Sequence, residues 1–273
     1  MTAPARARRV RRLPFGAFVV AVFLAIAVVG PWISPRSPSA IDLDAEYQLP
    51  SAAHLLGTGD NGVDVLSVIL HGARLAAVVS LSSVSISLLI GTALGIFGGY
   101  RGGRADHLVT GLADLVQAFP AIILNIAILA LVARPGVGHV ILALSANGWV
   151  LFARLSRAET LRLRESEFVG AARLLGASDA HLLTRHVAPN LMGPLLVQAT
   201  SAFGAAILAE STLSFLGLGP GTSVSWGALL DQGSAVLLRF PHVALIAGSA
   251  IAVTVLGFNL AGDWLRDVLD PRV

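Results

Sequence analysis

The 273-residue sequence contains no cysteine and no lysine, and only 13% of its residues are charged. Without cysteine the chain has no disulfide and no thiolate metal site, and the redox compartment is left open. The low charge and the 55% hydrophobic content exclude a soluble globular protein, because a chain of this size could not bury so much apolar surface. The net charge of +3 reflects where the arginines lie along the chain and does not indicate binding of nucleic acid.

Catalytic motifs are missing as well. The sequence has no G-x-x-x-x-G-K-[ST] phosphate loop, so it cannot hydrolyse ATP by that route, and it has no H-E-x-x-H pair. Its seven histidines are scattered over several segments, which disfavours a metal cluster. We therefore expect a chain that is not an enzyme, with no catalytic residue, no metal site and no cofactor bound to the chain itself.

Six long apolar runs are present instead. Roughly 20 apolar residues span a bilayer as a helix, whereas a barrel strand needs only about 10 alternating residues, so the length of the runs favours helices. The first run follows a basic head, but it is too long for a signal peptide and no clean cleavage site follows it. The sequence predicts an all-α integral membrane protein with six spans, at 14–33, 76–99, 107–133, 138–157, 190–215 and 241–262.

The arginines define the orientation of these spans. Six spans place both termini on one side, and with the N-terminus inside, 15 of the 19 arginines fall in inner segments. This bias predicts that both termini are cytoplasmic. The connecting segments are then a basic cytoplasmic tail at 1–13, an outer segment with a short helix at 34–75, a cytoplasmic loop at 158–189, an outer loop at 216–240 and a cytoplasmic tail at 263–273.

The cytoplasmic loop contains a polar, helix-forming stretch at 167–190. Ala171 and Ala172 belong to a small, apolar face, Gly176 permits the left-handed conformation that ends a helix, and Ser178 or Asp179 can cap the next piece. The pattern predicts a short helix-turn-helix with an exposed bend that fits a groove on a partner. The alternative is an amphipathic linker resting in the lipid headgroups.

Two acidic residues lie inside predicted spans, where a charge is costly and often functional. Asp114 and Glu210 have no obvious opposite charge in neighbouring spans, and the stacked acids of a proton relay are missing. We expect Asp114 to be a packing or interfacial residue rather than a proton carrier. Neutral polar residues in the spans either line a wet path or bond between helices; they are Gln117, Asn125, Asn147, Gln198 and Asn259.

Two glycine-containing segments have a predicted structural role. Gly91, Gly95 and Gly99 form a small-residue stripe that allows close helix contact, which favours packing within one subunit over a dimer motif.

In the outer loop, glycines and a proline disfavour a long helix across 216–230, and the indole of Trp226 suits the outer membrane interface. We predict an outer gate that cargo passes, or alternatively a plain surface loop; its residues are Glu210, Ser225 and Trp226.

The cytoplasmic loop resembles the E-A-A loop of ABC-transporter permease subunits. The resemblance is carried by Gly170-Ala171-Ala172, then Gly176, then His186-Val187-Ala188-Pro189-Asn190. In that family the loop carries a coupling helix that docks on the ATP-binding subunit. The resemblance implies that eight residues form an ATPase-coupling loop here: Gly170, Ala171, Ala172, Gly176, Ala177, Ser178, His186 and Pro189.

Three further segments resemble the same family in the same order. They narrow the resemblance to the second, C-type permease of the dipeptide, oligopeptide and nickel importers. The segments are His54-Leu55-Leu56-Gly57-Thr58, Ser214–Gly219 with Ser225-Trp226-Gly227, and Asn259–Arg272.

The resemblance implies a type I ABC importer permease fold and a multi-pass subunit of the bacterial inner membrane. It also implies a heterodimer with a homologous second permease, two ATP-binding subunits that hold ATP and Mg, and an extracytoplasmic solute-binding protein. Short peptides are the first expectation for cargo, and nickel or a metal chelate is the alternative. An ion-coupled secondary transporter is a remote alternative, because the sequence shows neither a mid-membrane charge relay nor an internal repeat.

The chain departs from the family pattern at several positions. Gly170 stands where the family has the glutamate that opens the E-A-A triplet, so no salt bridge can form from that position, and Glu165 and Glu167 are the nearest replacements. Ala188 stands where the family has a leucine before the loop proline. In the outer segment an aspartate and two arginines of the family are replaced by Gly59, Val63 and Val68.

Overall fold

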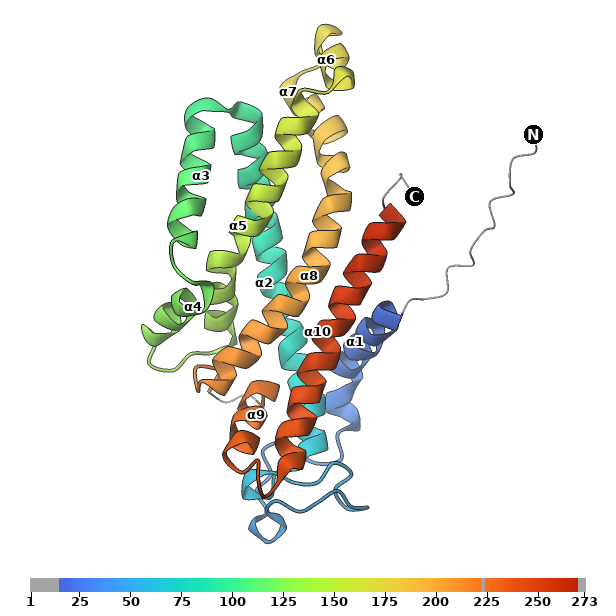
Figure 1. Cartoon of the computed structure of the whole chain (residues 1–273), viewed down its shortest axis with the longest axis vertical. Coiled ribbons are helices and arrows are strands. Elements are labelled where there is room, and N and C mark those ends of the chain that lie inside the picture. The colour runs from blue at the N-terminus through green and yellow to red at the C-terminus, as the bar shows by residue number, and fades with distance from the viewer. Residues whose placement is uncertain (1–14, 222–223, 270–273) are drawn as a thin grey trace, which may run out of the picture.

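The computed structural model describes residues 15–221 and 224–269, which contain helices and no β-strand. The predicted tail at 1–13 and the motif residues 270–272 lie outside the described residues. Figure 1 shows long helices side by side in one elongated bundle. These long helices are α1 (Phe15–Ile33), α2 (Val65–Arg101), α5 (Val137–Arg164), α8 (Ala188–Phe215) and α10 (Pro241–Leu269).

Shorter helices connect the long ones or lie at the two ends of the bundle. In Figure 1, α6 and α7 project at one end, while α9 and the outer segment lie at the other. The shorter elements are η1 (Leu43–Ala45), η2 (Asp60–Gly62), α3 (Gly103–Gln117), α4 (Ala121–Ala130), α6 (Glu167–Leu174), α7 (Asp179–Leu182), the π-helical turn η3 (Leu183–Val187) and α9 (Trp226–Ala235).

The all-α membrane fold is confirmed, with one difference in the third span. Within the described residues, five helices are long and apolar enough to cross a membrane, and α3 with α4 makes a sixth crossing if the pair is one span. The expectation of one continuous helix over 107–133 is wrong, because α3 and α4 are bent by 80°. Pro120 explains the break, since proline lacks an N–H and disfavours a helical conformation in the preceding Phe119.

The second span is longer than its apolar run. The short helix expected in the outer segment is not a separate element before the span: the residues from Val65 onward are the first turns of α2, which runs without interruption to Arg101. Asp64 caps this helix, and its carboxylate accepts a hydrogen bond from the backbone N–H of Ser67 at 2.9 Å. The chain therefore enters the bundle directly from the outer segment.

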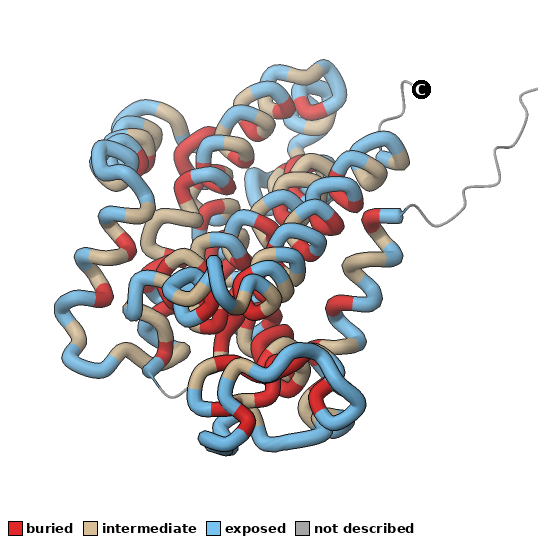
Figure 2. Tube along the Cα trace, turned by 60° about the horizontal axis from the view of Figure 1, so that its bottom comes forward, coloured by how far each residue is buried: buried red, intermediate tan, exposed pale blue. Residues whose placement is uncertain are grey.

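The glycine stripe of α2 packs against α5. A Cβ atom at Gly91 or Gly95 would collide with a backbone carbonyl oxygen of α5, and one at Gly99 would lie 2.9 Å from the carbonyl oxygen of Arg157. The prediction that these glycines serve packing within one subunit is confirmed. Figure 2 shows that the buried residues, drawn in red, gather in the interior of the bundle.

The first helix packs on the side of the bundle, against α2 and α10 (Figure 1). Phe23 of α1 makes edge-to-face contacts with Trp226 at 6.0 Å and with Phe258 at 5.8 Å between ring centroids. Many of the other large side chains of α1 are exposed, including Phe18, Val28 and Trp32. This exposed side is apolar, as expected of a helix that lies among lipids.

Candidate functional site

The cytoplasmic loop forms a helix-turn-helix beyond the ends of α5 and α8 (Figure 1). Gly176 has a φ of +87° and follows α6, so the predicted left-handed break is confirmed. The backbone N–H of Ala177 donates to the carbonyl oxygen of Ala172 at 3.1 Å, which satisfies the helix end. Ser178 caps α7 by accepting a hydrogen bond from the N–H of His181 at 3.3 Å, as the sequence predicted.

The bend of this loop is an exposed apolar knob. Leu174 is 91% exposed and Leu175 is 89% exposed, whereas Val169, Leu182 and Val187 are fully buried beneath them. The buried residues hold the loop against the helical bundle, and the two exposed leucines point away from that support. Isolated exposed leucines are ordinary, but an adjacent pair on a helix bend is a shape that fits a groove.

Six of the eight predicted coupling residues lie in α6 and in the bend that follows it, up to Ser178. The other two lie further along the chain, His186 in η3 and Pro189 at the start of α8. Gly170 has open space beside it, since an added Cβ would meet nothing within 4 Å. Glu165 and Glu167, the nearest replacements for the missing glutamate, are both exposed in the cytoplasmic loop. Exposed are Gly170, Ala171, Gly176, Ser178 and Pro189, and half-buried are Ala172, Ala177 and His186.

Tyr100 ties the loop to the inner end of α2. Its hydroxyl donates to the Oδ1 atom of Asp179 at 2.6 Å and accepts from the Nη2 atom of Arg173 at 3.3 Å. Arg164 strengthens the same junction by donating to the carbonyl oxygens of Gly99 and Tyr100. Sequence reasoning missed Tyr100, because its partners lie more than 70 residues away along the chain; an aromatic residue at the inner end of a span was the available signal.

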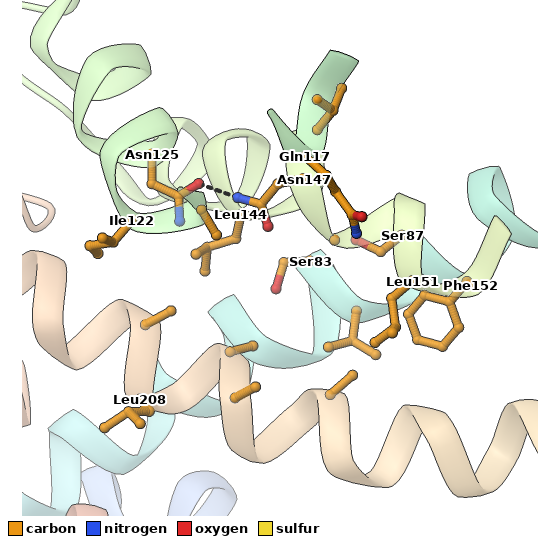
Figure 3. A pocket seen from close by; sticks show the side chains of 18 of the residues that line it. Ser83, Ser87, Gln117, Ile122, Asn125, Leu144, Asn147, Leu151, Phe152 and Leu208 are labelled. Carbon is orange, nitrogen blue, oxygen red and sulfur yellow. Dashed lines mark hydrogen bonds between the residues drawn. The ribbon is translucent and has the colours of Figure 1, made fainter. Parts of the chain in front are cut away.

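A cavity of about 660 Å³ lies between α2, α4, α5, α8 and the end of α3. Figure 3 shows the side chains of Asn125 and Asn147 pointing toward one another on the side of the cavity that faces α8. The Nδ2 atom of Asn147 donates to the Oδ1 atom of Asn125 at 2.6 Å. The polar lining side chains are all neutral: Ser83, Ser87, Gln117, Asn125, Asn147 and Thr212.

Bonding between helices is confirmed for two of the neutral polar residues of the spans, Asn125 and Asn147. The role in a wet path stays a prediction. Gln117, Asn125 and Asn147 line the cavity, and two of them also bond across helices. Asn259 lines a different cavity, of about 570 Å³, between α8 and α10. Gln198 lies on α8 outside both cavities.

The expectation that Asp114 has no opposite charge nearby is wrong. Its Oδ1 atom accepts from the Nη2 atom of Arg154 on α5 at 2.7 Å. A second ion pair joins the same two helices, between Asp106 and Arg157. The pairs arise because α3 runs beside α5, a neighbour relation that spacing in the sequence does not reveal. An ion pair between helices fits the expected packing or interfacial role of Asp114.

The prediction that Trp226 lies at the outer membrane interface is wrong. Its side chain is 3% exposed, and its Nε1 atom donates to the carbonyl oxygen of Ile69 at 2.9 Å, so a protein carbonyl stands where water was expected. Gly72 makes room for the ring, because a Cβ there would lie 2.5 Å from the Cδ1 atom of Trp226. The ring of Trp226 therefore packs inside the helical bundle and holds α9 there, and it does not lie among the lipid headgroups.

The remaining outer-gate residues lie next to this anchor. Ser225 caps α9 by accepting from the N–H of Ala228 at 3.0 Å. Gly227 lies so close to α8 that an added Cβ would collide with the carbonyl oxygen of Ser211. Glu210, which precedes Ser211 on α8, is buried, and its carboxylate accepts a hydrogen bond from the hydroxyl of Ser214 at 2.7 Å. The three predicted residues are thus gathered at one helix junction, while their role as a gate stays a prediction.

Known proteins resemble both the sequence and the fold. Residues 91–273 match the family described as binding-protein-dependent transport system inner membrane component. The chain is 41% identical over 270 residues to a putative peptide transport system permease protein of Brucella suis, covering 98% of this chain and 90% of that protein. It is 37% identical over 259 residues to a dipeptide transport system permease protein of Alkalihalophilus pseudofirmus, covering 94% of this chain and 85% of that protein.

A solved structure has the same fold. The similarity to an inward-facing methionine ABC transporter has a TM-score of 0.62 at 16% identity, and it covers 74% of this chain and 96% of that one. At this identity the likeness concerns the fold alone. It supports the type I importer fold that the sequence motifs implied.

Proposed function

Since the chain belongs to the family of binding-protein-dependent transport system inner membrane components, and is a permease subunit of an ABC importer, we propose that its cargo is short peptides. The support for this cargo is that the relatives reported above are named for peptide and dipeptide transport. The proposal places the chain in a bacterial inner membrane, as one half of the translocation path. Nickel or a metal chelate has no such support from these relatives.

The proposed complex contains three further kinds of subunit. A homologous second permease completes the path, an extracytoplasmic solute-binding protein delivers the cargo, and two ATP-binding subunits hold ATP and Mg and carry out the hydrolysis. This chain itself binds no cofactor in the proposal. Its contribution is to form the path and to receive the movement of the ATPase.

The observation that carries the coupling role is the exposed apolar knob on the cytoplasmic loop. Leu174 and Leu175 would fill a groove on the ATP-binding subunit, and the buried Val169, Leu182 and Val187 would pass its displacement to the bundle. A packed helix unit moves as a body rather than deforming gradually, because its interior is close-packed. Movement of the ATPase is thereby converted into movement of α5 and α8, which border the cavity.

The test replaces the knob with a charge in the complete reconstituted complex. Leu175→Asp should leave the folded chain intact, since the side chain is exposed, but it should lower peptide uptake and cargo-stimulated ATP hydrolysis at least about tenfold by placing a carboxylate in an apolar contact. Leu43→Asp, which alters an exposed leucine of the outer segment, away from the membrane spans and the cytoplasmic loop, is the matched control. Unchanged uptake in Leu175→Asp would remove the loop from the coupling contact.

A further inference from the structure

We propose that the cavity between α2, α4, α5 and α8 is a charge-free half-site that holds peptide cargo by the amide groups of its backbone. This inference rests on the proposed peptide cargo and adds the residues that recognise it. Most of the polar residues that line the cavity come from α2, α3, α4 and α5, whereas α8 contributes four alanines, Leu208 and Thr212. No charged residue is among the described residues that line it. Its volume of about 660 Å³ lies in the range of roughly 300–1,000 Å³ that holds small-molecule ligands.

The pair formed by Asn125 and Asn147 is a preformed complement to a peptide bond. Their mutual hydrogen bond uses one donor and one acceptor and fixes the orientation of both amide groups. The Nδ2 atom of Asn125 and the Oδ1 atom of Asn147 remain, and neither makes a hydrogen bond within the described part of the chain. Figure 3 shows both atoms directed toward the side of the cavity bordered by α8. They offer a donor and an acceptor, which a peptide bond matches with its C=O and N–H.

Ser87 supplies a second polar position on the same wall. Ser87 is only 3% exposed and lines the cavity. A hydroxyl at such a position can donate a hydrogen bond to a ligand or a water molecule, or accept one from it. Gly148 leaves the space for this hydroxyl, because a Cβ at that position would lie 2.5 Å from the Oγ atom of Ser87. Gln117 at the end of α3 also lines the cavity.

The opposite wall explains how one cavity accepts different peptides. It is built from α8, which contributes Ala202, Ala205, Ala206 and Ala209 to the lining. Short side chains leave room for the side chains of the cargo without forming directional contacts. Recognition of the backbone on one wall and tolerance of side chains on the other suit cargo that varies in sequence.

The experiment uses the complex of this chain with its partner permease, ATP-binding subunits and binding protein, reconstituted in proteoliposomes. Uptake of alanyl-alanine, alanyl-lysine and alanyl-glutamate is measured, together with alanyl-alanine methylated on its peptide nitrogen. Asn147→Asp should raise uptake of alanyl-lysine relative to alanyl-glutamate about tenfold over wild type, because a carboxylate is added to a cavity that had no charge. Asn147→Leu should reduce the discrimination against the methylated peptide.

Asn259→Asp is the matched control, since it makes the same change in the separate cavity between α8 and α10, and it should leave the lysine-to-glutamate preference as in wild type. An unchanged preference in an assembled, peptide-transporting Asn147→Asp complex overturns the half-site but leaves the proposed peptide cargo standing. Loss of the partner permease on purification of both Asn147 variants also overturns it, because the cavity would then be an assembly contact. A wild-type complex that takes up none of the dipeptides overturns the proposed cargo and the half-site together.

Discussion

The inner and outer ends of the bundle both join apolar helices through polar segments, but they use their side chains in opposite ways. At the outer end, His54 and Asp64 are buried and bonded to each other, with 3.0 Å between His54 Nδ1 and Asp64 Oδ1. At the inner end, Leu174 and Leu175 stand almost fully exposed on a helix bend. The outer segment thus pairs these two buried polar side chains with each other, whereas the inner loop exposes two adjacent leucines on one bend. The outer segment exposes apolar side chains as well, but each to a smaller degree, 65–69% for Ile41, Leu43, Leu49 and Leu55.

The contrast extends to how each end is fixed to the long helices. The outer segment is held by several hydrogen bonds that are at least partly buried, among them one from the backbone N–H of Gln48 to the Thr58 hydroxyl and one between His242 and the carbonyl oxygen of Thr58. The inner loop is held by a few packed residues and by the exposed hydroxyl of Tyr100. Buried networks stabilise a fixed structure, and lightly held units move as bodies. The outer end is therefore expected to govern stability and the inner end to govern activity.

The largest stability effect should come from Asp64→Ala. The carboxylate accepts from the N–H and hydroxyl of Ser67 and contacts His54, so its removal leaves buried groups unpaired and α2 uncapped, at a cost of about 2–4 kcal/mol. Asp44→Ala, at an exposed position in the same segment, is the control. Thermal unfolding of the purified variants measures the difference. Equal melting temperatures for the two would show that the outer network adds nothing to stability.

Gly176→Val should act mainly on activity. A β-branched residue with a φ of +87° is strained by roughly 1–2 kcal/mol, so the bend of the loop should change while the membrane helices remain assembled. Uptake and ATPase stimulation by the complex should fall severalfold. Gly103→Val is the control, because it places the same strain, at a φ of +53°, in an inner turn outside the coupling loop. If both variants lose activity equally, the effect is general strain and the coupling role is not supported.

Asp114 should contribute little to transport, because we expect its only role to be the ion pair with Arg154. The variant that combines Asp114→Asn with Arg154→Gln removes both charges together, so neither is left without a counter-charge. ATP-driven uptake should stay within about twofold of wild type, since exposed pairs contribute little on their own. An uncoupler added while ATP is clamped should also leave uptake unchanged. A collapse of uptake in the presence of the uncoupler would instead support an ion-coupled transporter.

Features that depend on local chemistry were predictable from the sequence. Run length identified the spans, and the conformation of Gly176 and the cap at Ser178 followed from the properties of those residues. The break at Pro120 follows from equally local chemistry, but the apolar run on both sides suggested one span. The span at 107–133 was predicted from the length and hydrophobicity of its apolar run, and a single proline changes neither of these properties enough to divide the run.

Features that depend on helix neighbours were not predictable from one sequence. The ion pair of Asp114 joins α3 to α5, and the hydrogen bond of Trp226 reaches α2 across 157 positions. An indole at the end of an apolar run has the same sequence signature whether it faces headgroups or a neighbouring carbonyl. The cavity is a further case, because its amide side chains come from α3, α4 and α5 and meet only after those helices pack.

The smallest expected effect, and the finest test of the contrast between the two ends, is Tyr100→Phe. The hydroxyl that it removes bonds Asp179 and Arg173 at an exposed site, so the melting temperature should change by no more than the equivalent of a few tenths of a kcal/mol. The loop is attached to the bundle by the Tyr100 hydroxyl and by its buried apolar contacts, and the variant removes only the first. If the hydroxyl transmits loop movement to α2, the amount of peptide transported per ATP should still fall, by about twofold. Asp179→Asn keeps an acceptor for the hydroxyl and should retain the wild-type ratio. A Tyr100→Phe complex with an unchanged ratio would leave the buried contacts of Val169, Leu182 and Val187 as the route of coupling.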